Sequence, residues 1–231
     1  MRIIVFGANG PTGRLLTGQA LAAGHDVVAV TRRPEEFPST GDRLTVFGGD
    51  VRRADSVRAA VAGGDAVLST LGVPYGRKLV DTYSLGVANI VDAMCRNDIR
   101  RIAVVSSSAV DPQTFAHAGF LFNRVVQPFI TEFLGKTVYD DMRRMESVLT
   151  ATDLDWTIVR PGGLYNLPSV TDYTMAQGHL DHRYTARTDL AAALLRLVES
   201  DVFIRQVVGV ATTVENPTVL QLIRTEALAK R

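Results

Sequence analysis

Short apolar runs alternate along the chain with segments in which apolar residues recur three or four positions apart. The runs are rich in Val, Ile and Leu, and they begin near Arg2, Asp26, Leu44, Asp65, Arg101, Asp155 and Phe203. Continuous apolar runs of this length are typical of strands buried on both faces of a parallel sheet. Because helical spacing separates most of the runs, we expect parallel strands joined by right-handed helical connections.

In the helical segments, an apolar stripe predicts which side chains are buried and which are exposed. We predict helices after Gly13, around Val57, and over residues 79–96, 139–151 and 188–199. In the 79–96 helix, Cys95 is expected in or beside the buried side, where a thiol is inert. In the 139–151 helix, the apolar stripe predicts four exposed charged residues: Asp140, Asp141, Arg143 and Arg144.

Two segments show less regular patterns. Residues 114–134 are aromatic and apolar and are predicted to form a helix or lid that packs on the core, walls a substrate pocket or pairs with another subunit. Residues 166–185 lack periodicity and predict a long substrate-side loop. His179 and His182 lie in that loop without a clear set of metal-binding partners, so no metal site is predicted.

Length and composition limit the number of domains, the binding partners and the cellular compartment to be expected. The chain has 231 residues, which predicts a single domain over 1–231 with substrate-side segments at about 111–137 and 163–186. Lys and Arg total 25 against 24 acidic residues, so no global positive field favours nucleic acid or a membrane surface. The single cysteine favours the reducing cytoplasm, and neither a leader segment nor a membrane span is predicted.

The first apolar run leads directly into a glycine-rich turn. Gly7, Gly10 and Gly13 follow it at regular spacing, and a helix-spaced pattern begins at once. Glycines at such a turn let the backbone approach a pyrophosphate, and the N–H groups of the new helix favour an anion. The turn predicts a nucleotide phosphate site; a glycine-rich turn without a ligand is the alternative.

The end of the second run distinguishes between two cofactors. NAD-binding folds place an acidic residue there for the ribose 2′-OH, whereas an arginine accommodates a 2′-phosphate. This chain has Arg32 and Arg33 and no carboxylate at that point. The charges favour NADP over NAD, unless both arginines are merely solvated loop residues.

The residues that follow the third, fourth and fifth apolar runs are further candidates for contact with a ligand. Asp50 and Val51 follow the third run, where a carboxylate could accept from the adenine amine, although Gly-Asp is also a common turn and helix cap. Thr70 to Gly72 follow the fourth run as a small-residue loop that could approach a ribose. Ser106 to Ser108 follow the fifth run at the edge where open α/β sheets bind ligands, with a polar loop and helix cap as the alternative.

With these landmarks in place, the chain resembles the atypical short-chain dehydrogenase/reductase superfamily. The similarity is to its NAD(P)H-binding group, which includes biliverdin reductase B/flavin reductase and NmrA-like proteins. It rests on residues 7–13, 31–33, 49–51, 104–108 and 154–162, in the family's order over nearly the whole chain. The resemblance implies an α/β fold: a Rossmann-like, doubly wound, mainly parallel sheet of about seven strands with helices on both faces.

The resemblance also implies bound NADP(H) and a set of contacts to it. The implied cofactor-binding residues are Gly7, Asn9, Gly10, Pro11, Thr12, Gly13, Arg14, Arg32, Arg33, Asp50, Val51, Thr70, Leu71, Gly72, Ser106 and Pro161. Of these, residues 10–14 would lie by the pyrophosphate. Ser106 and Pro161 would approach the nicotinamide.

The candidate chemistry departs from the larger superfamily. Standard members use Tyr-x-x-x-Lys, whose lysine lowers the tyrosine pKa, and the nearest match here is Tyr139-x-x-x-Arg143. Ser107 or Ser108 would orient a substrate, with solvent or Tyr139 as the proton source. The expected activity is NADPH-dependent reduction of a small flat or carbonyl-containing molecule, such as a flavin or quinone. The alternative is a non-enzymatic NADP(H) sensor of the NmrA-like type, with 114–134 contacting a protein partner or second copy.

Overall fold

The computed structural model describes residues 1–76, 78–111, 135–178, 180 and 184–214. Its main sheet has eight strands in the order β3-β2-β1-β4-β5-β6-β10-β8 among these residues. Seven of them are parallel: β1 (Arg2–Phe6), β2 (Asp26–Thr31), β3 (Leu44–Gly48), β4 (Ala66–Ser69), β5 (Arg101–Val105), β6 (Asp155–Pro161) and β10 (Gln206–Ala211). The expected Rossmann-like, mainly parallel sheet is therefore confirmed.

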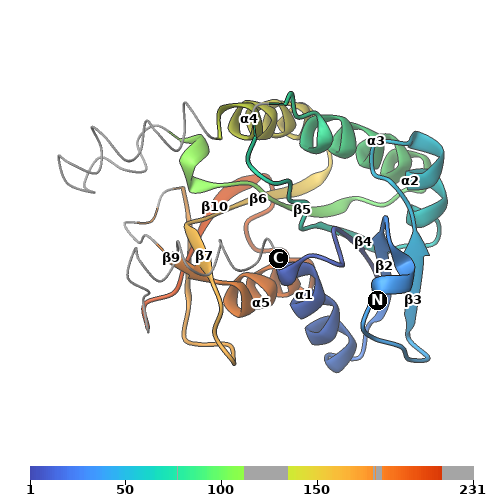
Figure 1. Ribbon diagram of the computed structural model, residues 1–231, viewed down its shortest axis with the longest axis horizontal. Helices are drawn as coiled ribbons and strands as arrows, with labels where there is room; N and C mark the ends of the chain where they lie inside the picture. The colour runs from blue at the N-terminus through green and yellow to red at the C-terminus, as the bar shows by residue number, and fades with distance from the viewer. Residues whose placement is uncertain (77, 112–134, 179, 181–183, 215–231) are drawn as a thin grey trace.

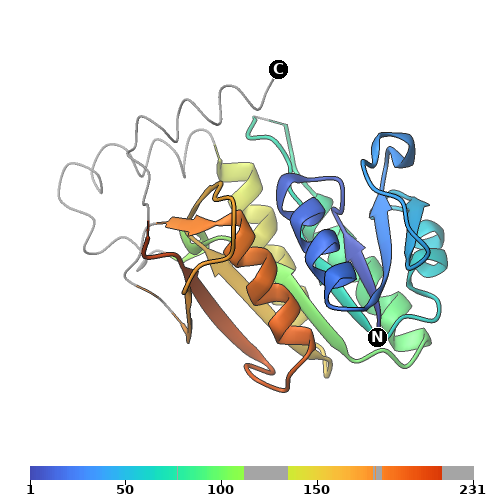
Figure 2. The ribbon, with the colours of Figure 1, turned by 90° about the horizontal axis from the view of Figure 1, so that it is seen from below.

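Helices cover both faces of this sheet (Figure 1). On one face lie α2 (Ala54–Val61), α3 (Thr82–Arg96) and α4 (Lys136–Thr150); on the other lie α1 (Pro11–Ala22) and α5 (Arg187–Val198). Figure 2 shows α1 and α5 side by side. Strand β1 contributes side chains to the hydrophobic core on each face of the sheet. Ile4 and Phe6 pack toward α2–α4, whereas Ile3 and Val5 pack toward α1 and α5. Alternation within an apolar run thus supplies a core on each face.

Part of the segment expected to be a loop forms strands, whereas residues 166–173 form no helix or strand, as predicted. Strand β8 (Thr174–Gln177) pairs antiparallel with β10 at the sheet edge, and β7 (Gly163–Tyr165) pairs with β9 (Tyr184–Ala186) in a second small sheet. The loop prediction for 166–185 was wrong at β8 and at the start of β9. An antiparallel edge strand has one face free, so it needs no continuous apolar run.

Two side-chain predictions were also wrong. Asp141 is completely buried, because its carboxylate accepts hydrogen bonds from the start of α3. Cys95 is exposed, because it follows buried Met94 and one residue turns a helix by about 100°. The predicted segment 114–134, with His179 and His182, lies outside the described residues. No helix in the described ranges combines the length and apolar character that a membrane span requires.

Candidate cofactor site at the carboxyl edge of the sheet

The strand order reverses between β1 and β4, and the glycine turn follows β1 at that point. From here the chain continues into α1 on one face, while the chain after β4 leads to α3 on the other. Open α/β sheets bind ligands outside the carboxyl ends of the strands at such a reversal. The predicted phosphate turn therefore lies where the fold places a nucleotide.

Gly7 and Gly13 are required by the packing of the turn. Gly7 has a positive φ of 76°, and a Cβ there would lie 2.6 Å from the carbonyl oxygen of Thr70. A Cβ on Gly13 would lie 2.3 Å from the carbonyl oxygen of Gly7. The Thr70 hydroxyl donates to the carbonyl oxygens of Phe6 and Gly7 at 3.1 and 3.2 Å, which ties the turn to the end of β4.

The first turn of α1 presents backbone donors without a side-chain cap. Gly10 is the N-cap residue, Pro11 follows it, and the first turn carries no acidic side chain. Thr12 is buried at the second helical position. Arg14 folds back on the turn, where its Nη2 donates to Asn9 Oδ1 at 2.7 Å. An uncapped helix start beside a guanidinium has the donors and charge that suit a pyrophosphate.

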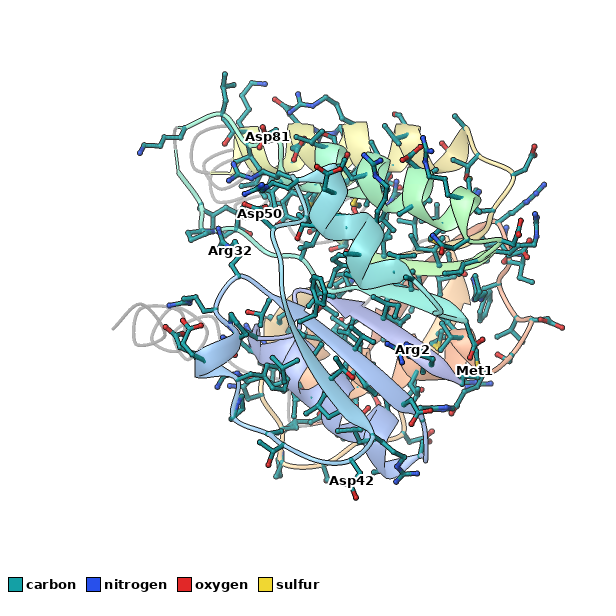
Figure 3. All side chains as sticks on the ribbon, turned by 90° about the vertical axis from the view of Figure 1, so that its right-hand side faces the viewer. Met1, Arg2, Arg32, Asp42, Asp50 and Asp81 are labelled. Atoms are coloured by element: carbon teal, nitrogen blue, oxygen red, sulfur yellow. The ribbon has the colours of Figure 1, made fainter. Side chains whose placement is uncertain are left out.

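The two arginines after β2 differ in their surroundings. Arg33 Nη1 lies 3.0 Å from Glu36 Oε1, in an exposed ion pair. Arg32 is exposed and makes no hydrogen bond or ion pair with any residue the structure describes. Figure 3 shows Arg32 at the same end of the molecule as Asp50 and Asp81, opposite Met1 and Arg2. Arg32 thus differs from Arg33 in that it forms no ion pair with a described carboxylate, although its charge acts on the nearby Asp50.

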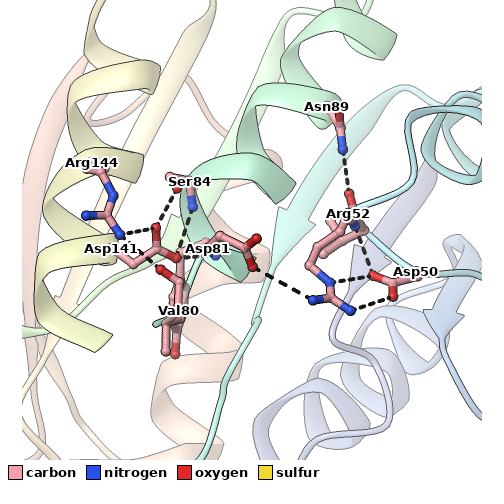
Figure 4. Close-up of polar contacts among 10 residues, drawn as sticks. Asp50, Arg52, Val80, Asp81, Ser84, Asn89, Asp141 and Arg144 are labelled. Carbon is pink, nitrogen blue, oxygen red and sulfur yellow. Dashed lines mark hydrogen bonds and ion pairs between the residues drawn. The ribbon is translucent and has the colours of Figure 1, made fainter. Parts of the chain in front are cut away.

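Asp50 belongs to a chain of charges that runs from the end of β3 to the start of α3. Arg52 Nη2 lies 3.3 Å from Asp50 Oδ2, and Arg52 Nη1 lies 3.8 Å from Asp81 Oδ1 (Figure 4). Burial alone would raise the pKa of Asp50, but hydrogen bonds from Arg52 and the charges of Arg52 and Arg32 lower it below its ordinary value. Asp50 is therefore held as a carboxylate, the form that accepts hydrogen bonds.

The other residues expected near the adenine and ribose differ in exposure. Val51 is buried, and a Cβ on Gly86 of α3 would lie 2.9 Å from its Cγ2. Leu71 packs against the same core from a half-buried position. Gly72 is exposed, with open space where a Cβ would project. A ligand could contact Gly72 more readily than Val51.

Ser106 points into a buried polar network and away from solvent. Its hydroxyl donates to Glu146 Oε1 of α4 at 2.6 Å. Arg160 of β6 binds the same carboxylate through Nε and Nη2 at 3.0 and 2.7 Å, and its Nη1 lies 3.1 Å from Asp111 Oδ2. The bond to Glu146 raises the pKa of Arg160. Pro161 ends β6 beside this network and is buried.

The remaining serines lie at a short turn beside α4. Ser107 precedes the 3₁₀ turn η2 (Ser108–Val110), and its Oγ accepts from the Ala109 N–H at 3.2 Å. Ser108 is half-buried at the first position of this turn. The helix-cap interpretation of this stretch thus applies to Ser107, while the catalytic interpretation of both serines stays a prediction.

Tyr139 and Arg143 lie one turn apart on α4 but have different neighbours. The Tyr139 hydroxyl is 2.9 Å from that of Tyr75, and its side chain is only 4% exposed. Burial raises the pKa of Tyr139 far above its usual value, and Tyr75 adds to the rise, whereas a hydrogen bond from Ser107 opposes it. Arg143 donates to the Val110 carbonyl at 3.3 Å and pairs with Asp140 at 2.9 Å. At neutral pH, Tyr139 is a neutral phenol.

Three residues at this edge have partners that the sequence did not reveal. Tyr75 lies in an aperiodic loop, and Glu146 resembled one more polar residue on the outer face of a helix. Asp141 accepts from the Tyr83 N–H at 2.8 Å and from the Ser84 hydroxyl at 2.5 Å, so it caps α3 from another helix (Figure 4). Asp141 and Met145 are four residues apart, which is the one signal that could have placed this carboxylate on the buried face.

The parallel sheet and the glycine turn at its carboxyl edge define a Rossmann-type nucleotide-binding protein. Comparison with known proteins identifies its family. The sequence profile of a family described as NAD(P)H-binding matches residues 7–201. The chain therefore belongs to this NAD(P)H-binding family of atypical short-chain dehydrogenases/reductases.

Two solved structures share the fold. A short-chain dehydrogenase/reductase from Veillonella parvula, in complex with NADP, superposes with a TM-score of 0.76 at 21% identity, over 92% of this chain and 94% of that one. ChuY, an anaerobilin reductase from Escherichia coli O157:H7, has a TM-score of 0.73 at 24% identity, over 94% of this chain and 100% of ChuY.

Two of the relatives found by sequence are described as uncharacterised proteins. A protein of Mycobacterium tuberculosis is 39% identical over 109 residues, which are 46% of this chain and 12% of that protein. The chain thus matches 12% of the length of that larger relative. YhfK from Bacillus subtilis, named an uncharacterised sugar epimerase, is 27% identical over 84% of this chain and 86% of its own length.

Proposed function

We propose that the chain is an NADPH-dependent reductase that transfers hydride to a small flat or carbonyl-containing acceptor, such as a flavin or quinone. The observation that carries the cofactor assignment is the exposed Arg32, which makes no ion pair with a described residue and lies at the edge that bears the glycine turn. An arginine that is not engaged in an ion pair is free to bind a 2′-phosphate through charge-assisted hydrogen bonds.

The residues present fit NADP(H). The uncapped start of α1 at Gly10 and Pro11 would bind the pyrophosphate, with Arg14 and Asn9 beside it. Arg32 would bind the 2′-phosphate, with Arg33 further from it because Arg33 pairs with Glu36. The loop at Thr70–Gly72 would lie along a ribose. The two structural neighbours, of which one was solved in complex with NADP and the other is a reductase, support this assignment.

Bound NADPH would supply the hydride, and the protein would hold the acceptor and provide a proton. Ser107 and Ser108, at the end of β5, would orient the acceptor's oxygen, with Ser106 and Pro161 beneath them on the nicotinamide side. Tyr139 would present a protonated phenol to the acceptor, because burial raises its pKa, and either Tyr139 or solvent would supply the proton. Arg143 would help to hold this wall of the site through Val110.

The test is NADPH oxidation across a panel of flavins, quinones and carbonyl compounds, with NADPH binding measured in parallel by nicotinamide fluorescence. We expect turnover with at least one acceptor and a clear preference for NADPH over NADH. Tight NADPH binding without turnover across the panel would contradict the reductase. That result would favour a non-enzymatic NADP(H)-binding regulator.

A further inference from the structure

Tyr75 reaches from the solvent-exposed loop after β4 to the buried hydroxyl of Tyr139. Its side chain is 49% exposed, whereas Tyr139 is 4% exposed. The two hydroxyl oxygens are 2.9 Å apart, and the ring centroids are 6.0 Å apart with the planes tilted by 50°. The pair thus joins a half-exposed hydroxyl directly to a buried one.

This loop has other anchors near Tyr75, so the tyrosine contact is not needed to hold it. The Thr137 hydroxyl of α4 donates to the Gly76 carbonyl at 3.1 Å. The Val73 N–H donates to the Tyr83 hydroxyl at 3.2 Å. Both contacts tie the same stretch to the helices beneath it without using the hydroxyl of Tyr75 or Tyr139.

Loss of the Tyr139 proton is energetically unfavourable at this buried position. Burial raises its pKa far above the usual value, and no cation in the described part of the chain pairs with it, because the guanidinium of Arg143 is held by Val110 and Asp140. A phenolate left behind by proton donation would be a buried, unpaired charge. Proton donation by Tyr139 therefore requires a second donor that replaces the proton as it leaves.

We propose that Tyr75 is a positioning residue that relays protons from solvent to Tyr139 during acceptor reduction. The relay rests on the proposed reductase function. In the step, the acceptor's carbonyl carbon gains hydride from NADPH, and the C=O π electrons move to its oxygen. That oxygen takes the Tyr139 hydroxyl proton, Tyr139 takes the proton of Tyr75, and Tyr75 takes one from water. The sum is one hydride and one solvent proton added, giving an alcohol and NADP⁺.

The experiment compares Tyr75→Phe with Tyr83→Phe in the full chain. Tyr75→Phe removes the relay hydroxyl, whereas Tyr83→Phe removes the hydroxyl that anchors the same loop at Val73 and leaves Tyr75 and Tyr139 intact. We expect Tyr75→Phe to lower kcat roughly tenfold, with the acceptor KM and the NADPH Kd unchanged. Imidazole buffer, a small proton donor, should restore the rate in Tyr75→Phe. Tyr83→Phe should keep the original kcat and show no response to imidazole.

The other outcomes are equally decisive. If Tyr75→Phe and Tyr83→Phe have the same kcat and imidazole changes neither rate, the relay is wrong while the reductase stands. Tyr75→Leu, which also removes the ring, should show the same imidazole-sensitive loss; a loss confined to Tyr75→Leu would mean that ring packing matters and would overturn the relay. Absence of turnover in the original protein would refute the reductase and the relay together.

Discussion

The hydroxyl of Ser106, at the end of β5, donates to the buried carboxylate of Glu146 across 2.6 Å. Arg160 binds the same carboxylate with two nitrogens, so one side chain of α4 joins the ends of β5 and β6. Among the three consecutive serines, Ser106 thus serves the scaffold, and Ser107 and Ser108 are left as the candidates for acceptor contact.

Replacement of Glu146 should destabilise the protein strongly. Glu146→Ala leaves Arg160 partly buried beside a single remaining carboxylate, and breaking such a pair costs about 3 kcal/mol of unfolding free energy. Urea denaturation measures the change. Asp92→Ala is the control, because it breaks an exposed pair with Arg96 and should leave the midpoint unaltered. Equal midpoints for the two variants would show that the network is not a stabilising one.

Asp141 should stabilise the start of α3 from its place on α4. Asp141→Ala removes the acceptor for the Tyr83 N–H and the Ser84 hydroxyl, and loss of a helix cap costs about 1 to 2 kcal/mol. The neighbouring Asp140→Ala breaks only half-exposed pairs with Lys136 and Arg143, so a change below about 0.5 kcal/mol is expected. Thermal or urea unfolding of both variants checks the difference, which would vanish if Asp141 had no capping role.

Asp141 and Glu146 show which features of the structure could be predicted from the sequence and which could not. The parallel strands were predictable because burial on both faces forces an almost continuous apolar run, as in Ile3 to Phe6. The glycine turn was predictable because its backbone geometry leaves no room for a Cβ at Gly7 or Gly13, whereas the role of Arg32 stays a prediction. Asp141 and Glu146 were not predictable, because their burial depends on partners 58 and 40 residues away in the chain.

The same limit applies to the edges of the fold. Strand β8 carries no apolar run, because its side chains are half-buried or exposed and only its pairing with β10 defines it. Tyr75 belongs to a loop without periodicity, and its relation to Tyr139 appears only when β4 and α4 come together. Local patterns therefore located the cofactor edge, whereas the polar contacts that support it required the tertiary structure.

The glycines of α1 should differ sharply in their tolerance of alanine. Gly13→Ala places a Cβ 2.3 Å from the Gly7 carbonyl oxygen, so we expect a loss of about 1 to 3 kcal/mol in unfolding free energy and weaker NADPH binding. Gly18→Ala, on the same helix, meets no atom within 4 Å and should raise stability by about 0.5 to 1 kcal/mol. Denaturation and fluorescence titration test both; a well-tolerated Gly13→Ala would contradict the packing of the turn.

Alkaline pH should destabilise the protein through Tyr83. Burial raises the pKa of this phenol from 10.0 to about 12. Because the folded-state pKa is the higher one, the stabilisation is complete below about pH 10 and is lost as pH rises toward 12. Two pKa units correspond to about 2.7 kcal/mol. Unfolding free energy should fall by roughly this amount more in the original protein than in Tyr83→Phe over that range. Parallel pH profiles would contradict the prediction.

The most direct test of the account is the affinity of Arg32→Ala for NADPH and NADH, measured by nicotinamide fluorescence beside Arg33→Ala. If Arg32 binds the 2′-phosphate, its loss should raise the NADPH Kd roughly 10- to 100-fold and leave the NADH Kd unchanged. Arg33, paired with Glu36, should change the NADPH Kd by less than about fivefold. An unchanged preference for NADPH in Arg32→Ala would contradict the assignment.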